Sequence, residues 1–111
     1  MNNQEIIFNR KKIESIIKKH PDRYPIVISS KSIKCNHIKY ISTNMTVAEF
    51  MIILRKKINI SDTEALFFFI KDENNTDIMI QQSATIESLY NTYKDKNLIL
   101  NLMFEKEAVF G

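Results

Sequence analysis

The sequence predicts an α+β fold, and three observations support that prediction. Short apolar or β-branched runs, typical of strands, occur at residues 24–29, 65–71 and 97–104. Apolar residues recur at helical spacing in residues 46–58 and again in residues 86–93. A chain of 111 residues that is 44% hydrophobic can bury one core, so we expect a single compact domain.

The N-terminal segment is predicted to be a basic helix over residues 4–19. Its apolar residues, Ile6, Ile13, Ile16 and Ile17, fall near one face. The helix should end at "HPDRYP", because Pro21 disfavours helical geometry at His20. Between Arg10 and Arg23 the sequence has six basic residues and only two carboxylates. The formal net charge of the whole chain is only +3, which does not by itself indicate a nucleic-acid partner.

Two strands are predicted next, paired as a hairpin. The first is "YPIVIS" at residues 24–29, where Pro25 can sit only near a strand start or an edge. A polar loop with Lys31 and Lys34 leads to "HIKYIS" at residues 37–42, whose side chains alternate between the two faces.

The segment "TVAEFMIILRKKI", residues 46–58, is the clearest helix. Thr46 and Glu49 have the spacing of a capping box, in which each side chain accepts a hydrogen bond from the other residue's backbone amide. Three cations at residues 55–57 suit the negative end of the helix dipole.

The second half of the chain is predicted to complete the sheet. The run "ALFFFIK" is too apolar for a half-exposed strand, so it belongs inside the sheet. A turn at "DENNTD", an extended piece at residues 78–82, a short helix carrying Ile86, Leu89, Tyr90 and Tyr93, and the strand "NLILNLMF" follow. This order matches a β-grasp, a mixed sheet wrapped on one helix, with a helical extension at residues 1–23 and the β-grasp at residues 24–111.

The sequence offers little for catalysis. Two histidines, His20 and His37, and one cysteine, Cys35, leave metal and Cys-His sites without enough ligands. One glycine in the whole chain rules out the glycine-rich phosphate loops. We therefore expect no enzyme and no cofactor. No stretch approaches the length of a membrane span and no signal peptide is recognisable, so a cytoplasmic protein is expected.

That single glycine is Gly111, at the end of "EKEAVFG". A glycine carboxylate is the least hindered acyl group that a protein can offer, and it can enter a narrow active site. Gly111 is therefore interpreted as a substrate for transfer, not as a catalyst. Chance is the alternative, since average glycine usage is about 7%.

The chain resembles the autophagy ubiquitin-like modifiers, the GABARAP and light-chain-3 group. The resemblance rests on six segments in order: "KKHPDRYPIVI" (18–28), "KYI" (39–41), "TVAEFMIILRKKI" (46–58), "ALFFFI" (65–70), "LYNTYKDKN" (89–97) and "VFG" (109–111). Related modifiers that are joined to other proteins typically lack the P-D-R-x-P element, so Pro21 to Pro25 favour the lipid-linked branch.

The resemblance implies that Gly111 is activated by an ATP-using enzyme, passed through thioesters by a conjugating enzyme, and linked to phosphatidylethanolamine. It also implies a cysteine protease that processes or deconjugates the modifier. The chain ends at Gly111 either by encoding or by trimming. The membrane served would be the autophagosome or, as in some parasite members, a plastid-like organelle.

The resemblance further implies docking of aromatic-x-x-aliphatic peptide motifs of cargo receptors along the second strand. One pocket would be formed by Ile16, Pro25, Val27, Lys39, Ile41 and Ile99. The other would draw on Tyr40, Met45, Phe50, Ile53 and Leu54, and acidic flanks would meet Arg23 and Arg55 or Lys57. Val27, Ile53, Leu54 and Ile99 are equally well read as plain core.

The chain departs from the family pattern after Tyr40, where Ser42 and Thr43 replace apolar residues. Two alternatives to lipid conjugation also stay open. The modifier could be joined to a lysine of another protein, or the chain could be a noncovalent basic domain that binds nucleic acid, which its modest net charge does not favour.

Overall fold

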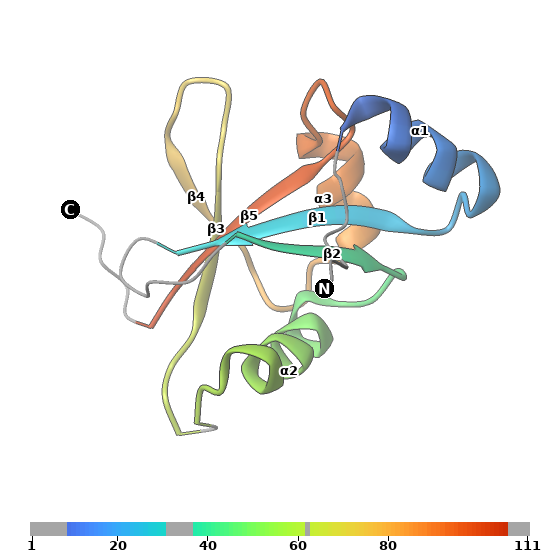
Figure 1. Cartoon of the computed structure of the whole chain (residues 1–111). Coiled ribbons are helices and arrows are strands. Elements are labelled where there is room, and N and C mark those ends of the chain that lie inside the picture. Colours follow the sequence, from blue (N-terminus) through green and yellow to red (C-terminus); the bar gives the residue numbers. More distant parts are fainter. Residues whose placement is uncertain (1–8, 31–36, 62, 107–111) are drawn as a thin grey trace.

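The computed structural model describes residues 9–30, 37–61 and 63–106 (Figure 1). Along the chain the elements are α1 (Arg10–Lys19), β1 (Tyr24–Ser29), β2 (Ile38–Ser42), α2 (Val47–Ile58), β3 (Phe67–Lys71), β4 (Asp77–Met79), α3 (Ile86–Tyr93) and β5 (Leu100–Glu105). The predicted α+β class and order of elements are confirmed.

The described strands form one mixed sheet of five strands in the order β2-β1-β5-β3-β4. β1 runs parallel to its neighbour β5, and the other pairings are antiparallel. The ubiquitin-like β-grasp is thus confirmed, with β5 threaded between the hairpin β1–β2 and the hairpin β3–β4. β2 and β4 are the two edges of the sheet within the described residues.

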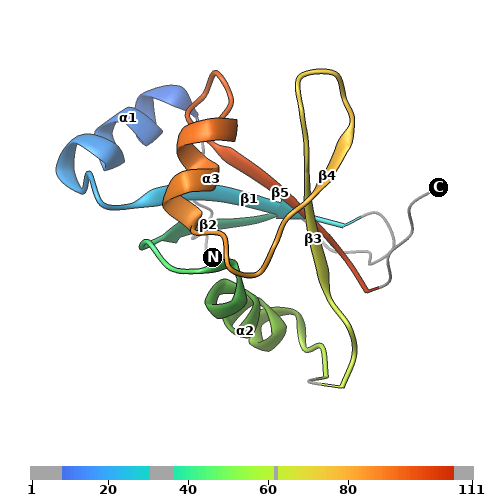
Figure 2. The ribbon, with the colours of Figure 1, turned by 180° about the vertical axis from the view of Figure 1, so that it is seen from behind.

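The main core lies between one face of this sheet and the helices α2 and α3, which both cover that face (Figure 2). Phe50 of α2, Phe68 of β3 and Phe104 of β5 are each no more than 1% exposed. Phe50 and Phe68 pack with ring centroids 6.1 Å apart. Burial of such large apolar side chains is the main favourable term for folding.

α2 forms where its sequence predicts it. Thr46 Oγ1 accepts a hydrogen bond from the Glu49 amide at 3.2 Å, and Glu49 Oε1 accepts one from the Thr46 amide at 3.0 Å. The capping box is therefore complete. These bonds favour the carboxylate and lower the pKa of Glu49, the bond from the Thr46 backbone being the largest cause. At the other end Asn59 takes the left-handed conformation, with φ of 56°, in the role usually given to glycine.

α1 is shorter than predicted. Asn9 is its N-cap, with extended backbone (φ −113°, ψ 164°), and its side chain accepts a hydrogen bond from the Lys12 amide. A helix that starts at this cap cannot run unbroken from residue 4, so that start was wrong, and residues 4–8 lie outside the described part of the chain. Ile13 is fully buried, and Ile16 and Ile17 are half-buried.

Several strand boundaries also differ from the prediction. β3 begins at Phe67 and not at residue 65, and β4 covers Asp77–Met79 where residues 78–82 were predicted. β2 begins at Ile38, one residue after His37. β5 begins only at Leu100, because the preceding turn places Leu98 at a φ of 64°, a conformation that no strand accommodates. β3 does lie inside the sheet, between β5 and β4, and its residues Phe68, Phe69 and Ile70 are all buried.

Candidate functional site

The strand for which the family resemblance implies peptide docking, β2, is an edge strand. Its inner side pairs with β1 from Tyr24↔Ser42 to Ile28↔Ile38, and no other described strand pairs with it. The outer side of an edge strand presents backbone donors and acceptors that can accept a further strand. Residues predicted for docking lie on both faces of this edge.

One group lies on the sheet face opposite α2 and α3. Tyr24, Ile26 and Ile28 point into the core, so Pro25 and Val27 point the other way. Their partners across the hairpin, Ile41 and Lys39, share that face. Pro25 is fully buried, whereas Val27, Lys39 and Ile41 are half-buried.

Ile99 and Ile16 complete this group at the start of the sheet. Leu100 pairs with Ile26 in parallel register, which places Ile99 next to Pro25. Ile99 is 6% exposed. Ile16 lies on α1 and is half-buried. Pro25 and Ile99 are thus largely covered, and the accessible apolar surface here comes from the half-buried residues.

A second group lies between β2 and α2. The Tyr40 ring packs edge-on against Phe50, with centroids 5.7 Å apart, and the Lys57 ammonium lies 5.3 Å from the centroid of the Tyr40 ring. Met45 and Ile53 are half-buried. Phe50 and Leu54 are each 1% exposed, so both belong to the core and can form only the floor of a pocket.

The predicted basic residues differ in what they contact. Arg23 Nε is buried without a hydrogen-bond partner and lies 3.9 Å from the Asp22 carboxylate. Arg55 Nη1 donates to the Ser61 carbonyl at 2.7 Å and to the Glu64 carbonyl at 2.8 Å. The Arg55 guanidinium therefore already holds the loop that follows α2.

Ser42, which departs from the family pattern, is accommodated by a hydrogen bond to its neighbouring residue. Ser42 is 1% exposed and pairs with Tyr24 across the hairpin. Its hydroxyl donates to the Thr43 carbonyl at 2.7 Å. Because that hydrogen bond satisfies the hydroxyl, the small polar side chain occupies a buried position without an unmet donor.

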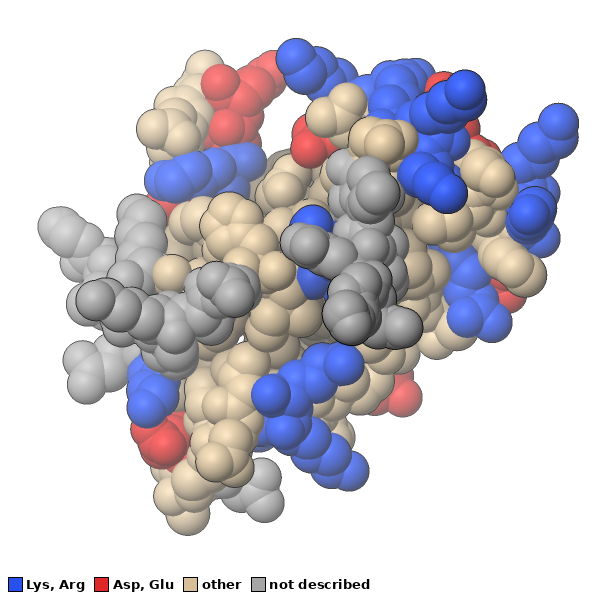
Figure 3. All heavy atoms as spheres, viewed as in Figure 1, with Lys and Arg blue, Asp and Glu red and all other residues tan. Residues whose placement is uncertain are grey.

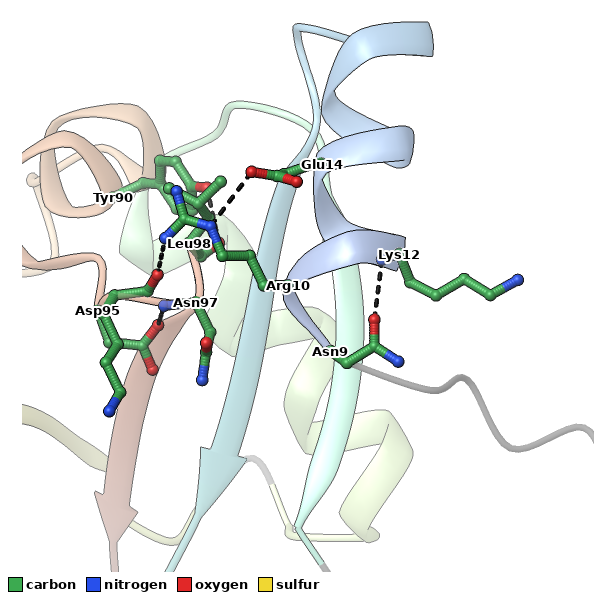
Figure 4. A network of polar contacts seen from close by, with 9 residues as sticks. Asn9, Arg10, Lys12, Glu14, Tyr90, Asp95, Asn97 and Leu98 are labelled. Atoms are coloured by element: carbon green, nitrogen blue, oxygen red, sulfur yellow. Dashed lines mark hydrogen bonds and ion pairs between the residues drawn. The ribbon is translucent and has the colours of Figure 1, made fainter.

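Sequence reasoning missed a polar network that joins α1 to the turn before β5 (Figure 4). Arg10 donates to the Lys96 carbonyl and pairs with Glu14 at 3.1 Å. Tyr90 Oη donates to the Leu98 carbonyl at 2.7 Å, and burial raises the pKa of Tyr90. An Asp two residues before an Asn, here Asp95 and Asn97, is the turn signal that could have located it.

Positive charge gathers on two parts of the surface in the view of Figure 1 (Figure 3). One lies over α1, with Arg10, Lys11, Lys12, Lys18 and Lys19, and the other over the end of α2, with residues 55–57. Gly111, and the loop with Lys31, Lys34 and Cys35, lie outside the described residues. None of the described helices is long and apolar enough to cross a bilayer.

Comparison with known proteins extends over nearly the whole chain. A sequence model of the family described as "Autophagy protein Atg8 ubiquitin like" matches residues 9–111. The crystal structure of Trypanosoma brucei ATG8 is similar to this chain with a TM-score of 0.74 and 25% identity, and the match covers 100% of both chains. The described fold, a mixed five-stranded sheet with an N-terminal helix, fits this match. The chain therefore belongs to the Atg8 family and is an autophagy-related ubiquitin-like modifier.

Proposed function

We propose that this modifier is conjugated through the carboxyl group of Gly111 to the amine of phosphatidylethanolamine. Family membership is the observation that carries the proposal. The position of the sole glycine at residue 111 supports it, because an unhindered acyl group suits passage along thioesters. In the last step the lipid amine displaces the enzyme thiol, so that an amide bond replaces the thioester bond.

In this account the chain is a substrate and not an enzyme. Its partners are the activating and conjugating enzymes of the pathway and a cysteine protease that removes it. Before conjugation it resides in the cytoplasm. Afterwards the two acyl chains of the lipid anchor it to an autophagosomal or plastid-like membrane, since two chains bind far more firmly than one.

The same proposal includes docking of receptor peptides along β2. An extended aromatic-x-x-aliphatic segment would add a strand to the β2 edge of the sheet, so that backbone pairing supplies affinity and side-chain pockets supply selectivity. The half-buried residues Val27 and Ile41 border one pocket. Tyr40 and Met45 border the other, with Phe50 and Leu54 beneath.

Acidic flanks of the peptide have a suitable partner in Arg23. Its Nε is buried and lacks a hydrogen-bond partner, and a buried donor without an acceptor is costly. The Arg23 side chain as a whole is 43% exposed, so a carboxylate from the peptide can pair with the exposed part of its guanidinium. Arg55, in contrast, already donates to two carbonyls, so Lys57 is the better candidate on α2.

The conjugation is tested by reconstitution. The protein is incubated with the pathway enzymes, ATP and liposomes that contain phosphatidylethanolamine. We expect a faster-migrating, membrane-bound adduct for the wild type and none for Gly111→Ala. Failure of the wild type to form any adduct, with a known family member reacting in parallel, would remove the proposal. An adduct larger by a whole protein would support the protein-linked alternative instead.

Docking is tested with a synthetic peptide that carries the acidic-flanked motif, by calorimetry. Ile41→Asp should abolish binding because it places a charge in the apolar border of the β2 edge. Ile52→Asp is the matched control, since Ile52 lies on α2 and is already 58% exposed. Equal loss of affinity in both variants, or no loss in either, would contradict the placement of the groove.

The nucleic-acid alternative makes a different prediction. Binding of duplex DNA would weaken steeply with salt, with a slope of about −0.9 per phosphate contacted. It would also be indifferent to Gly111→Ala and to Ile41→Asp. A binding assay at two salt concentrations separates this alternative from peptide docking.

A further inference from the structure

We propose that Glu64 and Lys106 are positioning residues, which fix the end of β5 relative to α2 and thereby favour the reaction of Gly111 on the activating enzyme. The proposal rests on the function proposed above and adds to it a specific ion pair. Neither residue touches the reacting atoms, so their role is exerted through the tail that follows.

The ion pair lies where the tail leaves the sheet. Lys106 directly follows β5, and its ammonium is 3.0 Å from Glu64 Oε2. Glu64 lies in the loop that leads from α2 into β3. Phe67 pairs with Glu105 in the adjoining strands, which places this loop beside the end of β5. The hydrogen bond from Lys106 is the largest cause of a lowered pKa at Glu64.

The loop that carries Glu64 is itself held. Arg55 Nη1 donates to the carbonyls of both Ser61 and Glu64, at 2.7 and 2.8 Å. The Glu64 amide also donates to the Ser61 carbonyl at 3.1 Å. The backbone of Glu64, whose carboxylate meets Lys106, is thus held to α2 and through α2 to the core.

A second contact holds the residue before Lys106. Glu105 is 2% exposed, and its Oε1 accepts a hydrogen bond from Ser30 Oγ at 3.3 Å. Ser30 directly follows β1. Consecutive residues at the end of β5 are therefore tied to two different segments, one after β1 and one before β3. Two such ties restrict the direction of the chain more than either does alone.

Direction matters because the remaining chain is short. Five residues follow Lys106, the last of them Gly111, and five residues fully extended reach about 17 Å. A carboxylate on so short a tether can enter an enzyme only when the body of the modifier docks at a matching angle. Misplacement of a reacting group by about 1 Å can cost 100-fold in rate.

Charge reversal and exchange provide the test. Glu64→Lys and Lys106→Glu each replace the attraction with repulsion, and the double variant restores a pair with exchanged charges. We expect each single variant to lower kcat/KM for thioester formation on the activating enzyme roughly three- to tenfold, the scale of an exposed ion pair and its reversal. The double variant should recover to within about twofold, because the pair re-forms.

Glu73→Lys is the matched control. Glu73 is an exposed carboxylate in the turn between β3 and β4, and its replacement changes the net charge as Glu64→Lys does. It should leave kcat/KM within about twofold of the wild type. An equal loss in Glu73→Lys, or a double variant no better than the singles, would show an effect of net charge alone and would overturn the inference.

Hydrogen exchange supplies a readout that needs no enzyme. The amides of Glu105 and Lys106 should exchange several-fold faster in the single variants and return toward wild-type rates in the double variant. Unchanged exchange in the single variants would overturn the inference. A wild type that never forms a thioester would instead remove the function proposed above, so the two failures can be told apart.

Discussion

The two faces of β1 differ in how deeply their side chains are buried. On the face toward α2 and α3, Ile26 and Ile28 are no more than 1% exposed. On the opposite face, Pro25 is buried but Val27 is only half-buried and lies beside the edge strand β2. Alternation along one strand therefore gives the core one set of side chains and leaves Val27 on the other face partly accessible.

A substitution in the core should have the largest effect on the free energy of unfolding. Phe104→Ala removes a side chain that is 0% exposed, and we expect it to lower the free energy of unfolding by about 3–5 kcal/mol. Equilibrium unfolding in urea measures this. Val27→Ala on the opposite face is the matched comparison and should cost about 1 kcal/mol, because its side chain is already partly solvated. Equal costs would mean that both faces serve stability alike.

A smaller effect is expected at the start of α2. Thr46→Ala removes the acceptor for the Glu49 amide and should cost about 1 kcal/mol in urea unfolding. Thr92→Ala, at an exposed position near the end of α3, is the control and should change stability by less than about 0.5 kcal/mol. A Thr46→Ala protein as stable as the wild type would mean that the packed face of α2 alone determines where the helix begins.

Tyr24, a core residue, also makes a hydrogen bond through its hydroxyl. Its hydroxyl donates to Glu87 Oε2 at 2.9 Å, and burial, followed by this bond, raises the pKa of Tyr24. Tyr24→Phe should therefore cost roughly 0.5–1.5 kcal/mol. Because the folded pKa lies above the unfolded one, the contribution is present at neutral pH and lost as pH rises through the folded pKa. Ultraviolet titration of the wild type and of Tyr24→Phe should differ by one tyrosine that ionises above the ordinary tyrosine pKa, and a difference at or below that pKa would contradict this.

The smallest effect concerns Glu64. Its pKa is lowered by the hydrogen bond from Lys106, so its contribution is present above the ordinary pKa of a glutamate. That contribution is lost as pH falls through the lowered folded value. Thermal melting between about pH 3 and 6 should show a shallower acid decline for Glu64→Gln than for the wild type. Identical profiles would show that the ion pair has no influence on stability.

The sequence predicted much of the fold because local signals agreed with tertiary packing. The Thr46–Glu49 spacing located α2 to within one residue, and the short β-branched run "YPIVIS" located β1 from Tyr24 to Ser29. At the N-terminus the apolar pattern extends further than the helix does. The helix begins only after Asn9, because the Asn9 side chain accepts a hydrogen bond from a backbone amide and caps it.

The candidate site was less predictable, because burial depends on residues distant in sequence. Phe50 and Leu54 have the same helical spacing as pocket residues, yet they are core. The pair of Glu64 and Lys106 joins residues 42 positions apart, and no local pattern indicates it. The family resemblance indicated the docking strand, but it carried no information on contacts specific to this chain.

The most direct measurement of the central claim is the intact mass of the membrane-bound protein from its own cells, beside that of a Gly111→Ala variant. The account predicts a gain equal to one phosphatidylethanolamine less one water, present in the wild type and absent in the variant. A membrane-bound wild type with no added mass, or the same gain in both proteins, would contradict conjugation through Gly111.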